Sequence, residues 1–181
     1  MLVEAAFAIP VLLLILMGAM EFGLVFASGA VTTGSSRSGA RLAATAYAPA
    51  GTTSNAQRTA TDSIAAAVTA DLKSLSHAAP VGMTIYLVNP SASDGAPTGG
   101  FPGDNLSGGC TANCIRYVWN GTTMVYSSGS WPSPDACGTT VDSVGVYVQV
   151  RHTYISGYIG TSRLVNGRTS MRLEPLPADQ C

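Results

Sequence analysis

Hydrophobic positions dominate the first thirty residues of the chain. Between Glu4 and Glu21 sixteen consecutive residues carry no charge, and nearly all of them are apolar; the chain then stays uncharged until Arg37. A helix that is apolar on every face cannot be covered by a small domain, so it must lie in a membrane or among copies of itself. The pattern predicts a stem over residues 1–47, helical from residue 2. At about 65 Å it is long enough for its first half to fit a membrane and its second half to project.

Small residues and one proline interrupt this stem. Pro10 lacks the amide that would bond the carbonyl of Ala6, so a kink or a local loosening is expected there. Glycine in an isolated helix costs up to about 1 kcal/mol relative to alanine, so recurrent glycines indicate close approach of helices. A single-pass anchor with incidental glycines is the simpler alternative. The glycines of the stem are Gly18, Gly23, Gly29, Gly34 and Gly39.

The remaining residues, 48–181, predict an α+β head. Ile64, Val68, Leu72 and Leu75 form one apolar stripe, which predicts an amphipathic helix over about 54–77 that packs on the projecting half of the stem. Alternation of apolar and polar residues then predicts an antiparallel sheet over about 81–175. Its expected strands are 81–88, 115–119, 122–126, 144–151 and 169–173, with turns at Asn120-Gly121 and Asn166-Gly167 and a long loop over 89–109.

The composition and the motifs of the chain argue against several classes of function. Charged residues make up only 10% of the chain and the net charge is −1, so no basic field exists to attract nucleic acid. No nucleophile elbow, phosphate loop or paired acids with a nearby histidine occurs, so we expect neither an enzyme nor a cofactor. His77 and His152 are interpreted as ordinary surface or sheet residues, and no zinc spacing of ligands is present.

Four cysteines lie in the later half of the chain, and their even number predicts two disulfides formed in an oxidising compartment. Cys114 and Cys137 bracket the Asn120-Gly121 hairpin, so we favour that bond, which leaves Cys110 to pair with Cys181. A Cys110–Cys114 bond is also sterically possible and would reverse this assignment.

The order of these features resembles the TadE-like proteins of the bacterial tight-adherence (Tad) pilus system, particularly those of actinobacteria. The resemblance lies in the segments Val3-Glu4-Ala5-Ala6-Phe7-Ala8-Ile9-Pro10, Gly18-Ala19-Met20-Glu21-Phe22-Gly23 and Ser170-Met171-Arg172-Leu173-Glu174-Pro175. It implies a prepilin that is cleaved ahead of the apolar segment and assembled from the cytoplasmic membrane into an extracellular filament of identical subunits. The Tad assembly machinery and a prepilin peptidase are the partners that the resemblance implies. Pilins of this broad class usually carry their acid at mature position five, whereas here it is Glu4.

Two acidic residues of the stem need an explanation. Glu4 could pair with the α-amino group of a neighbouring copy, as the resemblance to type IV pilins implies; an acid near a helix N-terminus is in any case favourable by about 0.3–1 kcal/mol. Glu21 lies 17 residues further along. It either reaches headgroup water or, in a filament core, pairs with Arg37 or Arg41 of an axially shifted neighbour.

These observations predict a structural subunit whose apolar helices bundle into a filament core and whose heads coat the surface, for use in adhesion. The stem residues expected at the interface are Glu4, Pro10, Gly18, Glu21, Gly23, Arg37 and Arg41. One alternative is a minor or membrane-anchored accessory protein that primes or tips a pilus made of another subunit. Another is a binding module whose sheet adheres to a surface, with the stem as a simple anchor.

Overall fold

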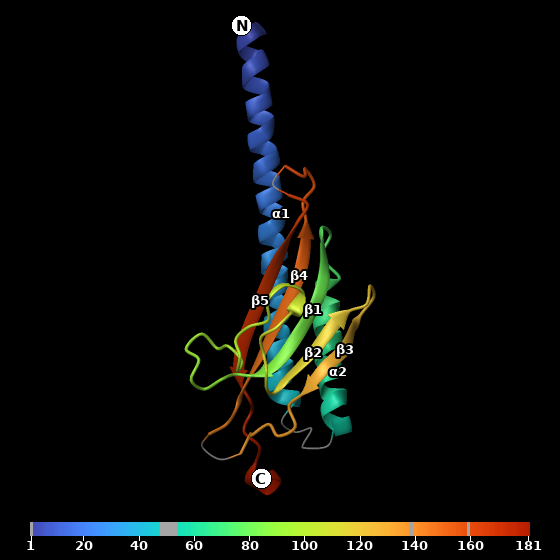
Figure 1. Ribbon diagram of the computed structural model, residues 1–181, viewed down its shortest axis with the longest axis vertical. Coiled ribbons are helices and arrows are strands. Elements are labelled where there is room, and N and C mark those ends of the chain that lie inside the picture. The colour runs from blue at the N-terminus through green and yellow to red at the C-terminus, as the bar shows by residue number, and fades with distance from the viewer. Residues whose placement is uncertain (1, 48–53, 138–139, 159) are drawn as a thin grey trace.

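The longest element of the fold is a single N-terminal helix (Figure 1). The computed structural model describes residues 2–47, 54–137, 140–158 and 160–181. α1 (Leu2–Ala46) contains 45 residues and continues through Pro10. Its N-terminal half extends beyond the head, and its C-terminal half lies alongside the sheet (Figure 1). The long stem helix is thus confirmed, while the boundary predicted between residues 47 and 48 falls at the edge of the described ranges.

The second helix, α2 (Ser54–Leu72), packs against the C-terminal half of α1. The predicted stripe is confirmed, since Ile64, Val68 and Leu72 are buried in the main core. The helix ends at Leu72, five residues before the predicted end at His77, and the first strand begins at Ala78, which pairs with His152.

Five antiparallel strands form one sheet in the order β3-β2-β1-β4-β5. The strand β1 thus sits at the centre, and β3 and β5 form the two edges. The fold is the predicted α+β arrangement of stem helix, second helix and antiparallel sheet. The strands are β1 (Ala78–Leu87), β2 (Cys114–Trp119), β3 (Met124–Ser130), β4 (Ser143–Thr153) and β5 (Ser162–Arg172).

The two faces of the sheet are covered by different material. Val146 and Val148 of β4 are fully buried on the face that meets α1 and α2. On the opposite face Tyr147 packs with Leu106, which belongs to the long loop between β1 and β2 and to its short 3₁₀ helix η1 (Asp104–Leu106). The loop is hydrogen-bonded to the sheet, since the Leu106 amide donates to Oε1 of Gln149 at 3.2 Å. The result is three layers, with helices behind the sheet and the loop in front (Figure 1).

The last strand is much longer than predicted, and the turn predicted at Asn166-Gly167 is wrong. β5 begins at Ser162, and Asn166 and Gly167 lie inside it, opposite Gln149 and Val148 of β4. The glycine is needed for packing rather than for a turn, because a Cβ atom there would lie 2.4 Å from the carbonyl oxygen of Thr32 on α1. The connection between β4 and β5 is instead a hairpin tip, whose described residues are 154–158, 160 and 161.

The disulfide pairing favoured from the sequence is also wrong. The bonds are Cys110–Cys114 and Cys137–Cys181. The side chain of Cys114 lies with Cys110 in the cluster beneath the long loop. Cys137 follows Ala136, whose carbonyl accepts the Leu176 amide at 2.9 Å, so the C-terminal tail already runs beside it. One bond therefore closes the end of the loop, and the other holds the C-terminal tail.

Candidate functional site: the apolar stem and its junction with the head

The bare part of α1 is the first feature that the fold leaves unexplained. Every residue from Ala5 to Met17 is exposed, and Phe7 reaches 75% exposure. In the part of the chain that the structure describes, α1 is the one helix long and apolar enough to cross a membrane. The large apolar side chains exposed here are Phe7, Ile9, Val11, Leu12, Leu13, Leu14, Ile15, Leu16, Met17 and Met20. Water is an unfavourable surrounding for such a surface, so lipid or other protein is expected to cover it.

The glycines of the stem differ in their surroundings, and a Cβ atom at Gly29 would make only an ordinary contact with Val165, at 3.9 Å. A Cβ atom at Gly18, Gly23 or Gly34 would meet nothing within 4 Å. A Cβ atom at Gly39 would instead lie 2.8 Å from Val68 of α2. Packing inside the subunit therefore explains Gly39 but not the first three, whose small size remains available for contact with another helix.

Glu21 marks the point where the head begins to cover α1. Its side chain is only 3% exposed. The amide of Ser156, in the β4–β5 hairpin tip, donates a hydrogen bond to its Oε1, while Oε2 has no partner among the described residues. Sequence reasoning missed this partner because 135 residues separate the two groups. The hairpin tip therefore covers the Glu21 carboxylate of its own chain.

Below Glu21 a row of small polar residues on α1 faces the sheet. Ser28, Thr32, Ser35 and Ser36 are all buried, and the hydroxyl of Thr32 donates back to the Ser28 carbonyl. Such back-bonding satisfies the hydroxyl within the helix, so it can pack on a strand without a further partner. The Ser36 hydroxyl also bonds that of Thr169 on β5 at 3.0 Å. Small side chains let the helix approach the sheet closely.

His152 of β4 is fully buried at the same junction. Its Nδ1 lies 3.0 Å from Oγ of Ser28, and its Nε2 has no partner among the described residues. Burial lowers its pKa below the usual value, an effect that the charge of Glu21 partly opposes. The imidazole is therefore neutral near pH 7. It is a sheet residue, as predicted, but it belongs to the interior.

The other predicted interface residues stay apart from Glu21 within one chain. Arg37 and Arg41 lie on the exposed side of α1 and line a shallow hollow with Ala67 of α2. Neither guanidinium has a hydrogen bond or ion pair to another described residue. Their pairing with Glu21 of a neighbouring copy stays a prediction, and it would require the hairpin tip to move. Glu4 lies on α1, and its side chain is outside the described part of the structure.

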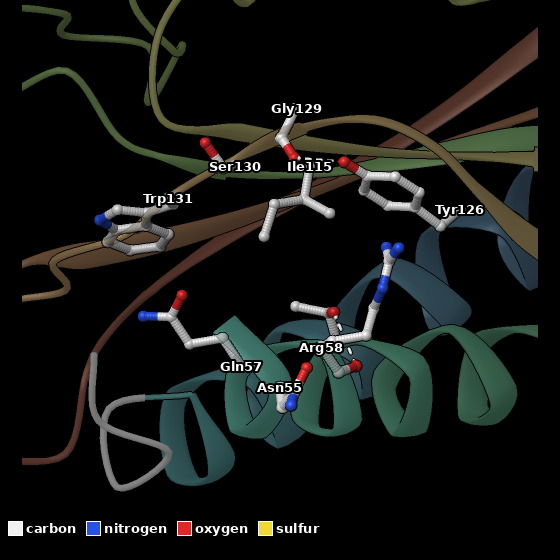
Figure 2. A pocket seen from close by; sticks show the side chains of 9 residues that line it. Asn55, Gln57, Arg58, Ile115, Tyr126, Gly129, Ser130 and Trp131 are labelled. Atoms are coloured by element: carbon white, nitrogen blue, oxygen red, sulfur yellow. Dashed lines mark hydrogen bonds between the residues drawn. The ribbon is translucent and has the colours of Figure 1, made fainter. Parts of the chain in front are cut away.

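The head also contains a hollow of about 270 Å³ between α2 and the strands β2 and β3 (Figure 2). The guanidinium of Arg58 rises from α2 over the ring of Tyr126, 3.3 Å from the ring centroid, and Trp131 closes one end. None of the described residues that line this hollow carries a carboxylate, an imidazole or a thiol, so these residues offer no acid–base pair. Its contacts join α2 to the sheet edge. Among the described residues no three His, Cys, Asp or Glu side chains gather as metal ligands.

The structure defines a class of protein in which a disulfide-bonded α+β head follows an exposed apolar stem helix. Residues 1–41 match the model of the TadE-like protein family, so this part of the chain is TadE-like. The match covers most of α1, including Glu21 and the arginines Arg37 and Arg41, and stops before α2. The actinobacterial type stays a prediction. No curated protein and no solved structure matches the chain.

Proposed function

We propose that this protein is a pilin that polymerises through α1 into an extracellular filament used in adhesion. The observation that carries the proposal is the bare apolar surface of α1 from Ala5 to Met20, which its own head leaves uncovered. Burying one large apolar side chain contributes about 1.5–3 kcal/mol, so ten such side chains provide a strong drive toward lipid or toward other stems. The match to the TadE-like family supports the association with a pilus.

Under this proposal the apolar stretch of α1 stays shielded from water when the protein moves from the membrane into the filament. Before assembly lipid surrounds the bare stretch; after assembly the stems of neighbouring copies surround it. Gly18, Gly23 and Gly34 have open space beside them and supply positions where a second helix can approach. The heads, with their two disulfides, then face the oxidising exterior.

A bulky substitution on the stem tests the proposal. Gly23→Leu should leave the head folded, because nothing lies within 4 Å of the missing Cβ, and should leave membrane insertion intact. It should reduce the yield of filaments sheared from the producing cells. Met20→Leu, at an exposed position of similar volume, is the matched control and should not reduce that yield. Normal filament yield from Gly23→Leu would contradict close stem packing at this glycine.

Cryo-electron microscopy of the same filaments separates the two pilus roles. If this chain is the main subunit, side-chain density along the filament matches its sequence, with residues 5–20 in the core. If the filaments consist of another protein and this chain is found at one end or stays in the membrane, the protein is instead a minor or anchored accessory component.

A further inference from the structure

The β4–β5 hairpin tip has an unusual surface for an exposed loop in its described residues, 154–158, 160 and 161. In sequence, residues 154–161 read Tyr-Ile-Ser-Gly-Tyr-Ile-Gly-Thr and contain no charge. Ile155 is 53% exposed and Tyr158 is 77% exposed. The tip of the other hairpin, between β2 and β3, reads Asn-Gly-Thr-Thr and is polar. An exposed tip that combines isoleucine and tyrosine without charge is typical of segments that contact an apolar or interfacial environment.

The hairpin tip is held in place against the stem. The Tyr154 amide donates to the Thr161 carbonyl at 3.1 Å, which closes the hairpin, and Gly157 turns the chain with a φ of 70°, a left-handed value that suits glycine. The Ser156 amide bonds Glu21, so the tip lies beside α1 at the point where the bare stretch ends (Figure 1).

The length of the bare stretch decides where this point falls relative to a membrane. The sixteen uncharged residues from Ala5 to Met20 span about 24 Å at 1.5 Å per residue, whereas the hydrocarbon core of a bilayer is about 30 Å thick. When α1 spans a membrane, Glu21 therefore lies at or just inside the hydrocarbon edge. A bare carboxylate there would be costly. The hairpin tip covers it, since the side chain is 3% exposed and accepts the Ser156 amide.

We propose that the hairpin tip docks into the interfacial layer of the lipid bilayer while α1 spans it, with Ile155 and Tyr158 as the inserting side chains. The inference rests on the membrane stage of the proposed function. Tyrosine is enriched at membrane–water interfaces, where its ring lies among headgroups and its hydroxyl reaches water. Arg163, exposed just after the tip, is placed to meet anionic headgroups. The tip thus shields Glu21 from lipid and sets the depth of the head.

Tryptophan substitutions test this docking in the full chain, reconstituted into vesicles of phosphatidylcholine and phosphatidylglycerol. Tyr158→Trp places a reporter at the apolar tip, and Thr122→Trp places one at the exposed polar tip of the other hairpin. Lipids brominated on acyl-chain carbons near the headgroup quench tryptophan at the interface. We expect Tyr158→Trp to lose emission and shift to the blue, and Thr122→Trp to behave like the unsubstituted protein.

The outcomes separate this inference from the proposed function. If the protein floats with the vesicles but Tyr158→Trp is quenched no more than Thr122→Trp, docking is overturned while the pilin proposal stands. If the protein does not float with the vesicles, the membrane stage fails and both are overturned. If quenching disappears when the protein is diluted with lipid, a second copy covers the tip and docking on lipid is overturned. Quenching that is independent of dilution supports docking.

Discussion

The two halves of α1 belong to one continuous helix but have opposite surroundings. From Ala5 to Met17 every residue is exposed, whereas Ala40, Ala43 and Thr32 in the second half are fully buried. The first half is built from large apolar residues, and the second half presents small residues to the sheet. Size rather than hydrophobicity therefore decides which half the head covers, because only a row of small side chains lets a helix lie close against a sheet.

The largest expected effect concerns the head that covers the second half. Cys137→Ala/Cys181→Ala opens a bond between residues 44 apart, which should lower the free energy of unfolding by about 4 kcal/mol in the chain-entropy treatment. Cys110→Ala/Cys114→Ala opens a bond between residues four apart and should cost about 2 kcal/mol. Urea unfolding followed by tryptophan fluorescence measures both. Equal losses would show that loop length does not govern these bonds.

A smaller loss is expected where the helix meets β5. Gly167→Ala places a Cβ atom 2.4 Å from the backbone oxygen of Thr32, so α1 or β5 must shift. Overpacking of this kind should lower the free energy of unfolding by about 2–3 kcal/mol. Gly18→Ala, with open space around the new methyl, is the control on the bare half and should leave the unfolding midpoint of the head unchanged. A loss from Gly18→Ala as large as that from Gly167→Ala would remove the distinction between the halves.

A local effect is expected at the border between the halves. Glu21→Ala removes the acceptor of the Ser156 amide, so the hairpin tip should open more often. Hydrogen exchange at residues 154–161 should become faster, while exchange in β1 should stay unchanged. Glu21→Gln keeps an acceptor oxygen and should show a smaller change. Unchanged exchange in Glu21→Ala would mean that other contacts hold the tip.

The smallest expected effect is a dependence on pH at the same border. Burial lowers the pKa of His152 in the folded protein below the usual value of 6.5. The unfolded chain therefore binds a proton more readily, and stability should fall as pH drops below about 6.5. The difference between urea midpoints at neutral and mildly acidic pH measures this. His152→Gln should reduce the difference between the two midpoints.

Local patterns predicted most of the fold. The uncharged run defined the stem, the stripe of Ile64, Val68 and Leu72 defined α2, and Asn120-Gly121 marked the connection between β2 and β3. The errors arose where distant parts of the chain meet. Asn166-Gly167 has the composition of a turn, yet the glycine serves the close approach of Thr32, and no local pattern contains that contact. The Ser156 partner of Glu21 was missed for the same reason, since 135 residues separate the two groups. The disulfide pairing was wrong although Cys110 and Cys114 lie only four residues apart, because the even number of cysteines does not specify which of them pair.

The alignment of α1 with β4 and β5 has a mechanical consequence. Because the helix runs alongside these strands (Figure 1), a force along the stem loads their shared contacts in shear, so many contacts resist together rather than in succession. The Glu174 amide donates to the carbonyl of Ala44 at 3.0 Å, and the Cys137–Cys181 bond ties down the tail beyond it. Tension that enters through the bare half of α1 would therefore pass into the head across its whole packed length.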